Sequence, residues 1–166
     1  KYRLICERFL ENPEEFGETF ARAWFKLLHR DMGPKSNYVS GDYKDVEYIW
    51  QDPTPTGKLL TSNEEDVIRK TLSDSDLSIQ EMVNTALSSA ITFRGSDNRG
   101  GANGSRIRLE PQKNWDVNKP HELEKVLDVY EKIADKYNAS IADVIVIGGA
   151  VGIEKACGHK VNVTTG

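Results

Sequence analysis

Apolar residues recur every three or four positions over several stretches of the chain, a spacing typical of amphipathic helices. The first stretch runs from Tyr2 to Glu11. A second follows Asn12-Pro13, where asparagine suits the position before a helix and proline suits its first turn. It ends just beyond Arg30, because Gly33-Pro34 cannot continue a helix. Two successive helices are therefore predicted at the start of the chain.

Serine followed three residues later by an acidic residue is a pattern that starts helices. It occurs as Ser62 with Glu65, Ser78 with Glu81, and Ser140 with Asp143. The first two pairs predict helices to about Leu72 and to Ala90. A further long helix is predicted from Asn118 and Pro120 to Tyr137, where apolar residues again recur at helical spacing.

The last segment, "IADVIVIGGAVGIEKA" (residues 141–156), gives conflicting signals. Its β-branched residues and glycines favour a strand, whereas its serine cap and alanines favour a helix. The pattern leaves both open. Elsewhere residues 35–61 are irregular, the stretch "RIRLEPQKNWDVN" (residues 106–118) predicts a loop with brief extended structure, and "QDPTPTGK" (residues 51–58) predicts an extended connector. The fold class predicted is mostly α.

Charge and cysteine content narrow the function classes. The 166 residues include 22 Lys and Arg against 26 Asp and Glu, a net charge of −4, which argues against a general nucleic-acid binder. We expect no membrane association, because no run reaches the ~18 apolar residues of a spanning helix. The two cysteines, Cys6 and Cys157, lie near opposite ends of the chain and do not indicate a disulfide framework. We therefore expect a reducing, cytoplasmic location. Lys1 opens inside a predicted helix, and we expect the chain to be part of a longer polypeptide.

Two short motifs near the C-terminus are weak candidates for a cofactor or metal site. If Gly148 opens a dinucleotide-binding fingerprint, Ala150 and Ile153 occupy the positions of its second and third glycines, and the side chain of Ala150 would keep a pyrophosphate away. Close helix packing at the glycines is the favoured interpretation. Cys157 and His159 supply two metal ligands where a structural site normally needs four. No metal site and no bound cofactor are expected for this chain alone.

A loop rich in glycine and arginine follows the helix that ends at Ala90. Its arginines are Arg94, Arg99, Arg106 and Arg108, and its glycines include Gly100, Gly101 and Gly104. Backbone amides freed by such glycines can form an anion nest. Arginine also bridges loop carbonyls and nearby acids, and this structural interpretation is favoured.

The triplet His29-Arg30-Asp31 lies where the second helix ends. Cations in the last turn of a helix answer the negative end of its dipole, so a plain capping role is one interpretation. An arginine at a helix end can also swing, because the helix no longer holds its base. Physical reasoning on these residues leaves both interpretations open.

Three long blocks in order resemble catalase-peroxidases, haem enzymes of the peroxidase superfamily that destroy hydrogen peroxide. The blocks are "ERFLENPEEFGETFARAWFKLLHRDMGP", "IWQDPTP" and "TFRGSDNRGGANGSRIRLEPQKNWDVN". The resemblance implies a mainly α protein of two homologous halves, of which the N-terminal half holds haem b and the C-terminal half has lost it. It places residues 1–55 at the end of the haem-bearing half, residues 56–75 in a linker and first helix, and residues 76–166 at the start of the haem-free half. The last segment is then expected to be a helix.

The resemblance also assigns roles to single positions. In the haem-bearing half the helix before the glycine-arginine loop carries a distal arginine, tryptophan and histidine, and the matching positions here are Asn84, Leu87 and Ser88. None of these side chains can relay a proton as an imidazole does. Arg30 matches a mobile arginine that approaches a covalent methionine-tyrosine-tryptophan adduct and supports the catalase reaction, so Arg30 is the one catalytic candidate.

The functional expectation is therefore a segment of a catalase-peroxidase, an oxidative-stress enzyme that decomposes hydrogen peroxide and oxidises organic donors through haem b. The distal residues and the iron-ligating histidine are expected upstream of Lys1, so this chain alone is expected to be inactive. Its partners would be the remainder of the enzyme chain and a second copy in a homodimer. Two alternatives stay open: a non-catalytic structural or dimerisation module supporting a haem domain, and an anion-binding domain that uses Arg94, Arg99 and Arg106.

Overall fold

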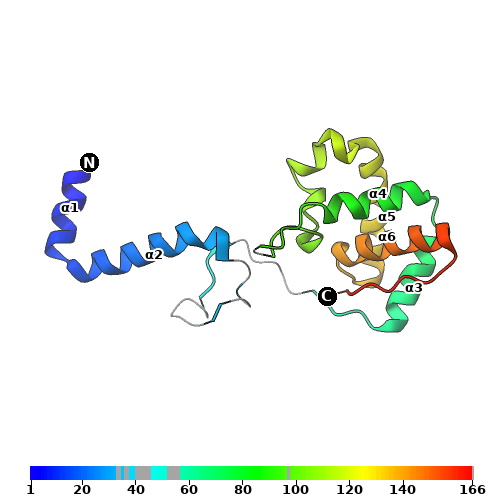
Figure 1. The fold of residues 1–166 in the computed structure, drawn as a ribbon, viewed down its shortest axis with the longest axis horizontal. Coiled ribbons are helices and arrows are strands. Elements are labelled where there is room, and N and C mark those ends of the chain that lie inside the picture. The colour runs from blue at the N-terminus through cyan, green and yellow to red at the C-terminus, as the bar shows by residue number, and fades with distance from the viewer. Residues whose placement is uncertain (33–34, 36–37, 40–45, 52–56, 97, 166) are drawn as a thin grey trace. The chain divides into compact units, whose positions relative to one another are not determined.

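The computed structural model describes residues 1–32, 35, 38–39, 46–51, 57–96 and 98–165. Its α-helices are α1 (Tyr2–Glu11), α2 (Pro13–Met32), α3 (Ser62–Ser73), α4 (Ile79–Ala90), α5 (Pro120–Tyr137) and α6 (Ile141–Cys157) (Figure 1). Short 3₁₀ helices are η2 (Ile49–Gln51), η3 (Asn103–Arg108), η4 (Gln112–Asn114) and η5 (Asp116–Asn118). Over these described ranges no named strand occurs, and the predicted mostly α class is confirmed. No helix in the described part of the chain is long and apolar enough to cross a membrane.

The chain divides into two compact units. The first consists of Lys1–Pro53 with Gly95–Asn98, and the second of Thr54–Arg94 with Arg99–Gly166. The second unit contains α3 to α6 and the whole buried hydrophobic cluster. The assignment of residues 1–55, 56–75 and 76–166 to the parts of a larger enzyme stays a prediction.

The first unit contains two amphipathic helices whose apolar stripes are largely exposed. The side chain of Asn12 ends α1, since its amide donates a hydrogen bond to the carbonyl of Arg8 at 3.1 Å. Along α2, Phe16, Phe20 and Trp24 are each 50–55% exposed. Their rings contact one another in series, with centroids 6.1 and 6.0 Å apart. No residue of α1 is buried. The buried residues of this unit include Phe25 and His29, which lie near the end of α2.

The helices of the second unit begin at side-chain caps. Ser78 and Glu81 form the predicted capping box of α4, and the hydroxyl of Ser140 accepts the N–H of Asp143 at 3.0 Å at the start of α6. The N-cap predicted for α3 was wrong by one residue. Thr61 is the N-cap, its hydroxyl accepts the N–H of Glu64, and Ser62 is already helical. Each such cap stabilises its helix by about 1 kcal/mol.

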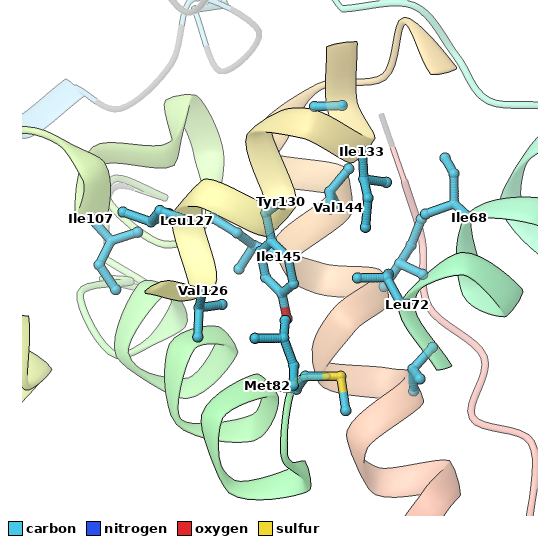
Figure 2. Packing of buried hydrophobic residues seen from close by; sticks show 14 of the residues in the cluster. Ile68, Leu72, Met82, Ile107, Val126, Leu127, Tyr130, Ile133, Val144 and Ile145 are labelled. Atoms are coloured by element: carbon cyan, nitrogen blue, oxygen red, sulfur yellow. The ribbon is translucent and has the colours of Figure 1, made fainter. Parts of the chain in front are cut away.

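The conflict over the last segment is resolved in favour of a helix. The segment forms α6, which is buried on most of its surface, including the β-branched Val144, Ile145 and Ile147. It packs against α4, α3 and α5, and Figure 2 shows Val144 and Ile145 facing the cluster around Tyr130 of α5. Burial against three helices outweighs the local preference of these residues for a strand.

The glycines of α6 allow the neighbouring helices to approach closely. A methyl group built on Gly149 would lie 2.4 Å from Cβ of Ala86 in α4, and one on Gly148 would lie 2.2 Å from the hydroxyl of Tyr130. Real Cβ atoms do not approach other atoms so closely, so only glycine fits at either position. The packing interpretation of these glycines is confirmed, and the segment does not form the strand that a dinucleotide fingerprint requires.

Residues 103–118 differ from the predicted loop with extended structure. They form three consecutive 3₁₀ helices, separated by residues in the extended region such as Leu109 and Trp115. The side-chain amide of Asn118 donates a hydrogen bond to the backbone carbonyl of Gln112 at 2.7 Å and so links η5 to η4. Lys119, with a φ of 50°, is the N-cap of α5, which begins at Pro120.

Candidate functional site

The predicted catalytic residue, Arg30, belongs to the last turn of α2. Its side chain lies outside the described residues, so its role stays a prediction. Of its two neighbours in the charged triplet, Asp31 is exposed and His29 is buried. The triplet therefore does not form one charged surface, because His29 is buried inside the first unit.

His29 lies in a cluster of aromatic rings that we call the aromatic cage: Phe25, His29, Tyr38, Tyr48 and Trp50. The His29 ring lies 5.1 Å from that of Trp50, nearly perpendicular to it, and 6.1 Å from that of Phe25. Tyr48 and Trp50 stack in parallel at 5.1 Å. Sequence reasoning missed this cluster, because the aromatic residues after α2 follow no period. Tyr43, in the same stretch, lies outside the described residues.

The second unit contains a cavity of about 270 Å³ beside α4. Asn84, Leu87 and Ser88 all line it, as expected for positions three and four apart on one helix face. The opposite wall comes from the segment around Trp115 and from α5. The structure thus brings together the three positions that the resemblance matches to a distal peroxidase site.

The charged groups of this cavity are already engaged. The carboxylate of Glu81 accepts a hydrogen bond from Nζ of Lys125 at 2.7 Å. Hydrogen bonds from Lys125 and from the backbone and hydroxyl of Ser78 hold the pKa of Glu81 at about 2. At the rim, Lys119 pairs with Glu122 at 3.3 Å. With its carboxylate ionised and paired, Glu81 is not poised near neutral pH as a general acid or base should be.

The glycine-arginine loop folds back onto the end of α4. The N–H of Arg94 donates to the carbonyl of Arg99 at 2.8 Å, and the N–H of Gly101 donates to the Thr92 hydroxyl at 3.0 Å. Gly100 has a φ of +78°, and a methyl group there would lie 2.1 Å from the carbonyl oxygen of Thr92. The N–H groups of Arg94 and Gly101 therefore serve the loop itself, and Arg94, Arg99 and Arg106 each have interaction partners. This geometry supports the structural interpretation over the anion nest.

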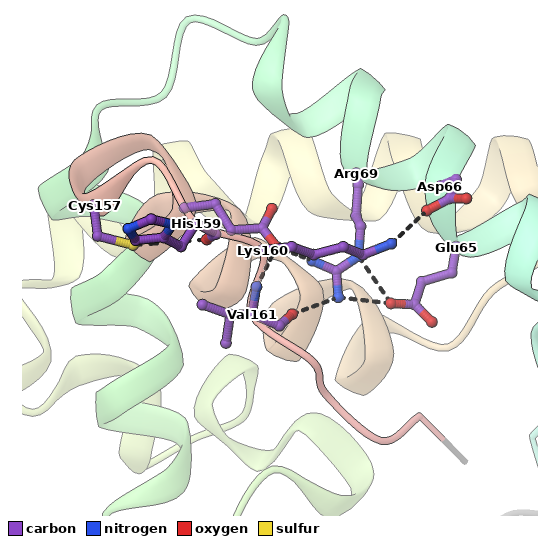
Figure 3. Close-up of polar contacts among 8 residues, drawn as sticks. Glu65, Asp66, Arg69, Cys157, His159, Lys160 and Val161 are labelled. Carbon is purple, nitrogen blue, oxygen red and sulfur yellow. Dashed lines mark hydrogen bonds and ion pairs between the residues drawn. The ribbon is translucent and has the colours of Figure 1, made fainter.

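A polar network fastens the C-terminal tail to α3 and α6 (Figure 3). The guanidinium of Arg69, 7% exposed, donates to Glu65 of α3, to Glu154 of α6 at 2.8 Å, and to the carbonyl of Val161 at 3.1 Å. The carboxylate of Glu154 also accepts the Val161 N–H at 2.7 Å. Sequence reasoning missed Arg69, because no local pattern distinguishes a buried arginine from an exposed one.

The pair Cys157 and His159 lies at the start of this tail. The thiol of Cys157 donates to the backbone carbonyl of His159 at 3.6 Å, and both residues are exposed. Within the ranges that the structure describes, no group of three or more His, Cys, Asp and Glu side chains is arranged to hold a metal ion. The two residues form no site together in this structure.

Comparisons with known proteins show the family to which the chain belongs. The family model described as peroxidase matches residues 18–166. The chain belongs to the peroxidase family. Within the family it is 57% identical, over 98% of its length, to the catalase-peroxidases of Chromohalobacter salexigens and Marinobacter nauticus. It is also 57% identical over 93% of its length to that of a Picosynechococcus species. The resemblance to catalase-peroxidases is confirmed.

The alignments with these catalase-peroxidases include nearly all of this chain but only part of each relative. The chain spans 23% of the length of the Chromohalobacter and Marinobacter enzymes and 21% of the Picosynechococcus enzyme. The activity, substrates and partners of a whole enzyme are therefore matters for proposal.

Catalase-peroxidases use haem, and the described residues of this peroxidase segment do not fit its ligation. Haem iron takes an axial ligand from His, Cys, Met or Tyr. No residue of any of these types lines the cavity beside α4. His29 is held inside the aromatic cage, and His121 and His159 lie on exposed surface. The cavity therefore offers no axial ligand of these types.

Proposed function

We propose that this chain is a segment of a catalase-peroxidase that decomposes hydrogen peroxide and oxidises organic donors with it. The observation that carries the proposal is the 57% identity over 98% of the chain. The haem b of that enzyme would be held by parts of the polypeptide other than the described residues. The segment alone would then have neither activity.

The second unit would serve as support in that enzyme. Its cavity is lined by Asn84, Leu87 and Ser88 where a distal site needs a proton relay. A helix without such groups still contributes its packing, which here joins α4 closely to α6. The same observation favours the second candidate function, a non-catalytic structural or dimerisation module for a haem domain.

A haem-binding experiment on the isolated chain tests whether this segment behaves as a complete haem domain. We expect added haemin to give no Soret band of an axially ligated haem when the purified chain is titrated. The physical reason is that the cavity offers no axial ligand. A saturable, histidine-ligated spectrum would contradict the proposal that the haem is held elsewhere. A preparation of the full-length polypeptide is the positive control and should give the band.

Arg30 would act in the catalase reaction of the full-length enzyme. A guanidinium is always charged and presents several donors, so it can stabilise a tyrosinate without losing a proton itself. We expect Arg30→Ala to lower catalase turnover at least about tenfold, the effect of losing one charge-assisted hydrogen bond, and to leave peroxidase turnover nearly unchanged. Both turnovers would be measured at equal haem content. Equal loss of the two activities, or no loss, would reject this role.

The remaining expectations concern assembly and location. We propose a cytoplasmic homodimer in which this segment contacts the remainder of its own chain. Light scattering of the full-length polypeptide tests the dimer directly, and a monomeric mass would reject it. Neither nucleic acid nor a membrane is proposed as a partner, in keeping with the net charge of −4.

A further inference from the structure

The end of α2 is anchored by a histidine in a place where helices usually fray. The last turn of a helix has carbonyls without intrahelical partners and is its least stable part. In α2 this turn contains His29, whose residue is only 5% exposed although its neighbours Leu28 and Met32 are 41% and 38% exposed. Something other than the apolar stripe therefore holds this turn.

The anchor is formed by residues that follow α2 in the chain. The ring nitrogen Nδ1 of His29 lies 3.3 Å from the hydroxyl of Tyr38, within hydrogen-bond distance. A buried imidazole needs such a partner, because an unpaired polar atom in an apolar site destabilises the fold by about 1–3 kcal/mol. The ring of Trp50 also packs against His29, with the two ring centroids 5.1 Å apart.

The rest of the aromatic cage makes this anchor stiff. Phe25, one helical turn before His29, is 8% exposed and contacts the rings of Tyr38, Tyr48 and Trp50 at 6.2, 6.4 and 5.4 Å. Nζ of Lys26 lies 5.8 Å from the Trp50 ring, a cation–π contact. The last two turns of α2 are thus tied to Tyr38 and to the 48–50 segment through ring contacts and the His29 hydrogen bond.

We propose that His29 is a positioning residue for Arg30. Arg30 is the next residue along α2, so holding His29 in the aromatic cage fixes the backbone from which the Arg30 side chain extends. The inference rests on the role proposed above for Arg30. A side chain that must reach a reacting group gains from a fixed base, since displacements of about 1 Å can lower a rate ~100-fold.

The test uses the full-length polypeptide and four variants: His29→Phe, Tyr38→Phe, Arg30→Ala and the His29→Phe/Arg30→Ala double variant. Phenylalanine keeps a ring in the cage and removes the hydrogen bond at His29. We expect His29→Phe to lower catalase turnover about tenfold and Tyr38→Phe to lower it by a smaller factor. Peroxidase turnover and haem content should stay close to those of the unmodified enzyme, which a merely structural role would not predict.

The double variant shows whether the effect passes through Arg30. If His29 only positions Arg30, its loss adds nothing once Arg30 is gone, and the double variant matches Arg30→Ala within about twofold. Independent, multiplying losses would overturn the proposal, and so would parallel loss of both activities in His29→Phe. If His29→Phe does not fold, Tyr38→Phe decides: an unchanged ratio of catalase to peroxidase turnover overturns the proposal.

A matched control removes a similar hydrogen bond far from this turn in sequence. Tyr137 and Thr71 share a hydroxyl–hydroxyl hydrogen bond of 2.9 Å within the second unit, and Tyr137→Phe should leave the activity ratio unchanged. The two proposals fail in different ways. If Arg30→Ala leaves the ratio unchanged, the role of Arg30 is wrong; if Arg30→Ala lowers it but both cage variants leave it unchanged, only the positioning role is wrong.

Discussion

The helices α2 and α6 are both rich in apolar residues and both carry interior glycines, but they use them in different ways. Along α2, Phe16, Phe20 and Trp24 are half exposed, and Gly17 has no atom within 4 Å of the place its Cβ would take. In α6 nine residues are buried, and a methyl group at Gly149 would lie 2.4 Å from Cβ of Ala86.

The difference shows what an apolar pattern does and does not specify. Periodicity identifies the face of an amphipathic helix such as α2 that can be covered, whereas the pattern of the α6 segment left both strand and helix open. Whether the face is covered depends on complementary surfaces elsewhere, which α6 finds on α3, α4 and α5. The second unit therefore contains the helices that bury α6, whereas the stripe of α2 contacts rings of its own helix and Phe9 of α1 and stays half exposed.

The same substitution at the two glycines should separate the two helices most strongly. We expect Gly149→Ala to lower the free energy of unfolding by about 3 kcal/mol, because the added methyl forces α4 and α6 apart. Gly17→Ala should instead raise it by up to about 1 kcal/mol through helix propensity. Denaturant unfolding of the 166-residue chain, followed by circular dichroism, measures both.

A compensating change identifies the cause at Gly149. The double variant Ala86→Gly/Gly149→Ala exchanges the methyl group between the two helices. It should recover most of the stability lost in Gly149→Ala, less about 1 kcal/mol for a glycine inside α4. No recovery would mean that the close approach of Ala86 and Gly149 is not what holds α4 to α6.

The polar network around Arg69 provides the test with the next largest expected effect on the stability of the second unit. We expect Arg69→Ala to lower the free energy of unfolding by about 2 kcal/mol, since hydrogen bonds to charged groups contribute about 1.5–3 kcal/mol. The loss leaves Glu154, 22% exposed at its side chain, without its guanidinium partner. The segment around Val161 should also become sensitive to proteolysis, because Arg69 holds its carbonyl.

A nearby exposed pair provides the control. Lys160 and Asp66 lie 3.3 Å apart with side chains 65% and 62% exposed. Exposed pairs of this kind contribute less than about 1 kcal/mol, so Lys160→Ala should change stability only slightly. If the two variants had equal effects, the burial of Arg69 would not be what makes the network strong.

The fold of the second unit was largely predictable, but its details depended on contacts distant in sequence. The stretch "TSNEE" contains two overlapping capping boxes, Thr61 with Glu64 and Ser62 with Glu65. The structure forms the first, which leaves Glu65 to pair with Arg69 and lets Glu64 pair with Lys58. Local propensity alone does not distinguish the two registers; the ion pair of Glu65 with Arg69, which also pairs with Glu154 of α6, favours the first.

The candidate site was predictable to a similar degree. The resemblance to catalase-peroxidases matched Asn84, Leu87 and Ser88 to the positions of a distal site, and all three line the cavity beside α4. The aromatic cage was not predictable, because the segment containing Tyr38, Tyr48 and Trp50 follows neither helical nor strand periodicity. Its order comes from the apolar area that large rings bury together. Such clusters leave no signal in local spacing.

The smallest predicted effect concerns a charged cap that α4 has and α1 lacks, since Lys1 makes no side-chain cap at the start of α1. The pKa of Glu81 is lowered from 4.5 to about 2 by Lys125 and Ser78. Its carboxylate therefore stabilises the folded chain above about pH 4.5, and this contribution is lost as the pH falls toward 2.

We expect Glu81→Gln to reduce the loss of stability between pH 5 and pH 2, the window set by that lowered pKa. Glutamine can still serve the capping box, so the change at pH 7 should be below about 1 kcal/mol. Denaturant unfolding at several pH values measures the slope. Lys125→Ala is the matched variant, because removing the ammonium should return the pKa of Glu81 toward its usual range and flatten the slope in part. An unchanged slope in both variants would show that the charge on this cap does not distinguish α4 from α1.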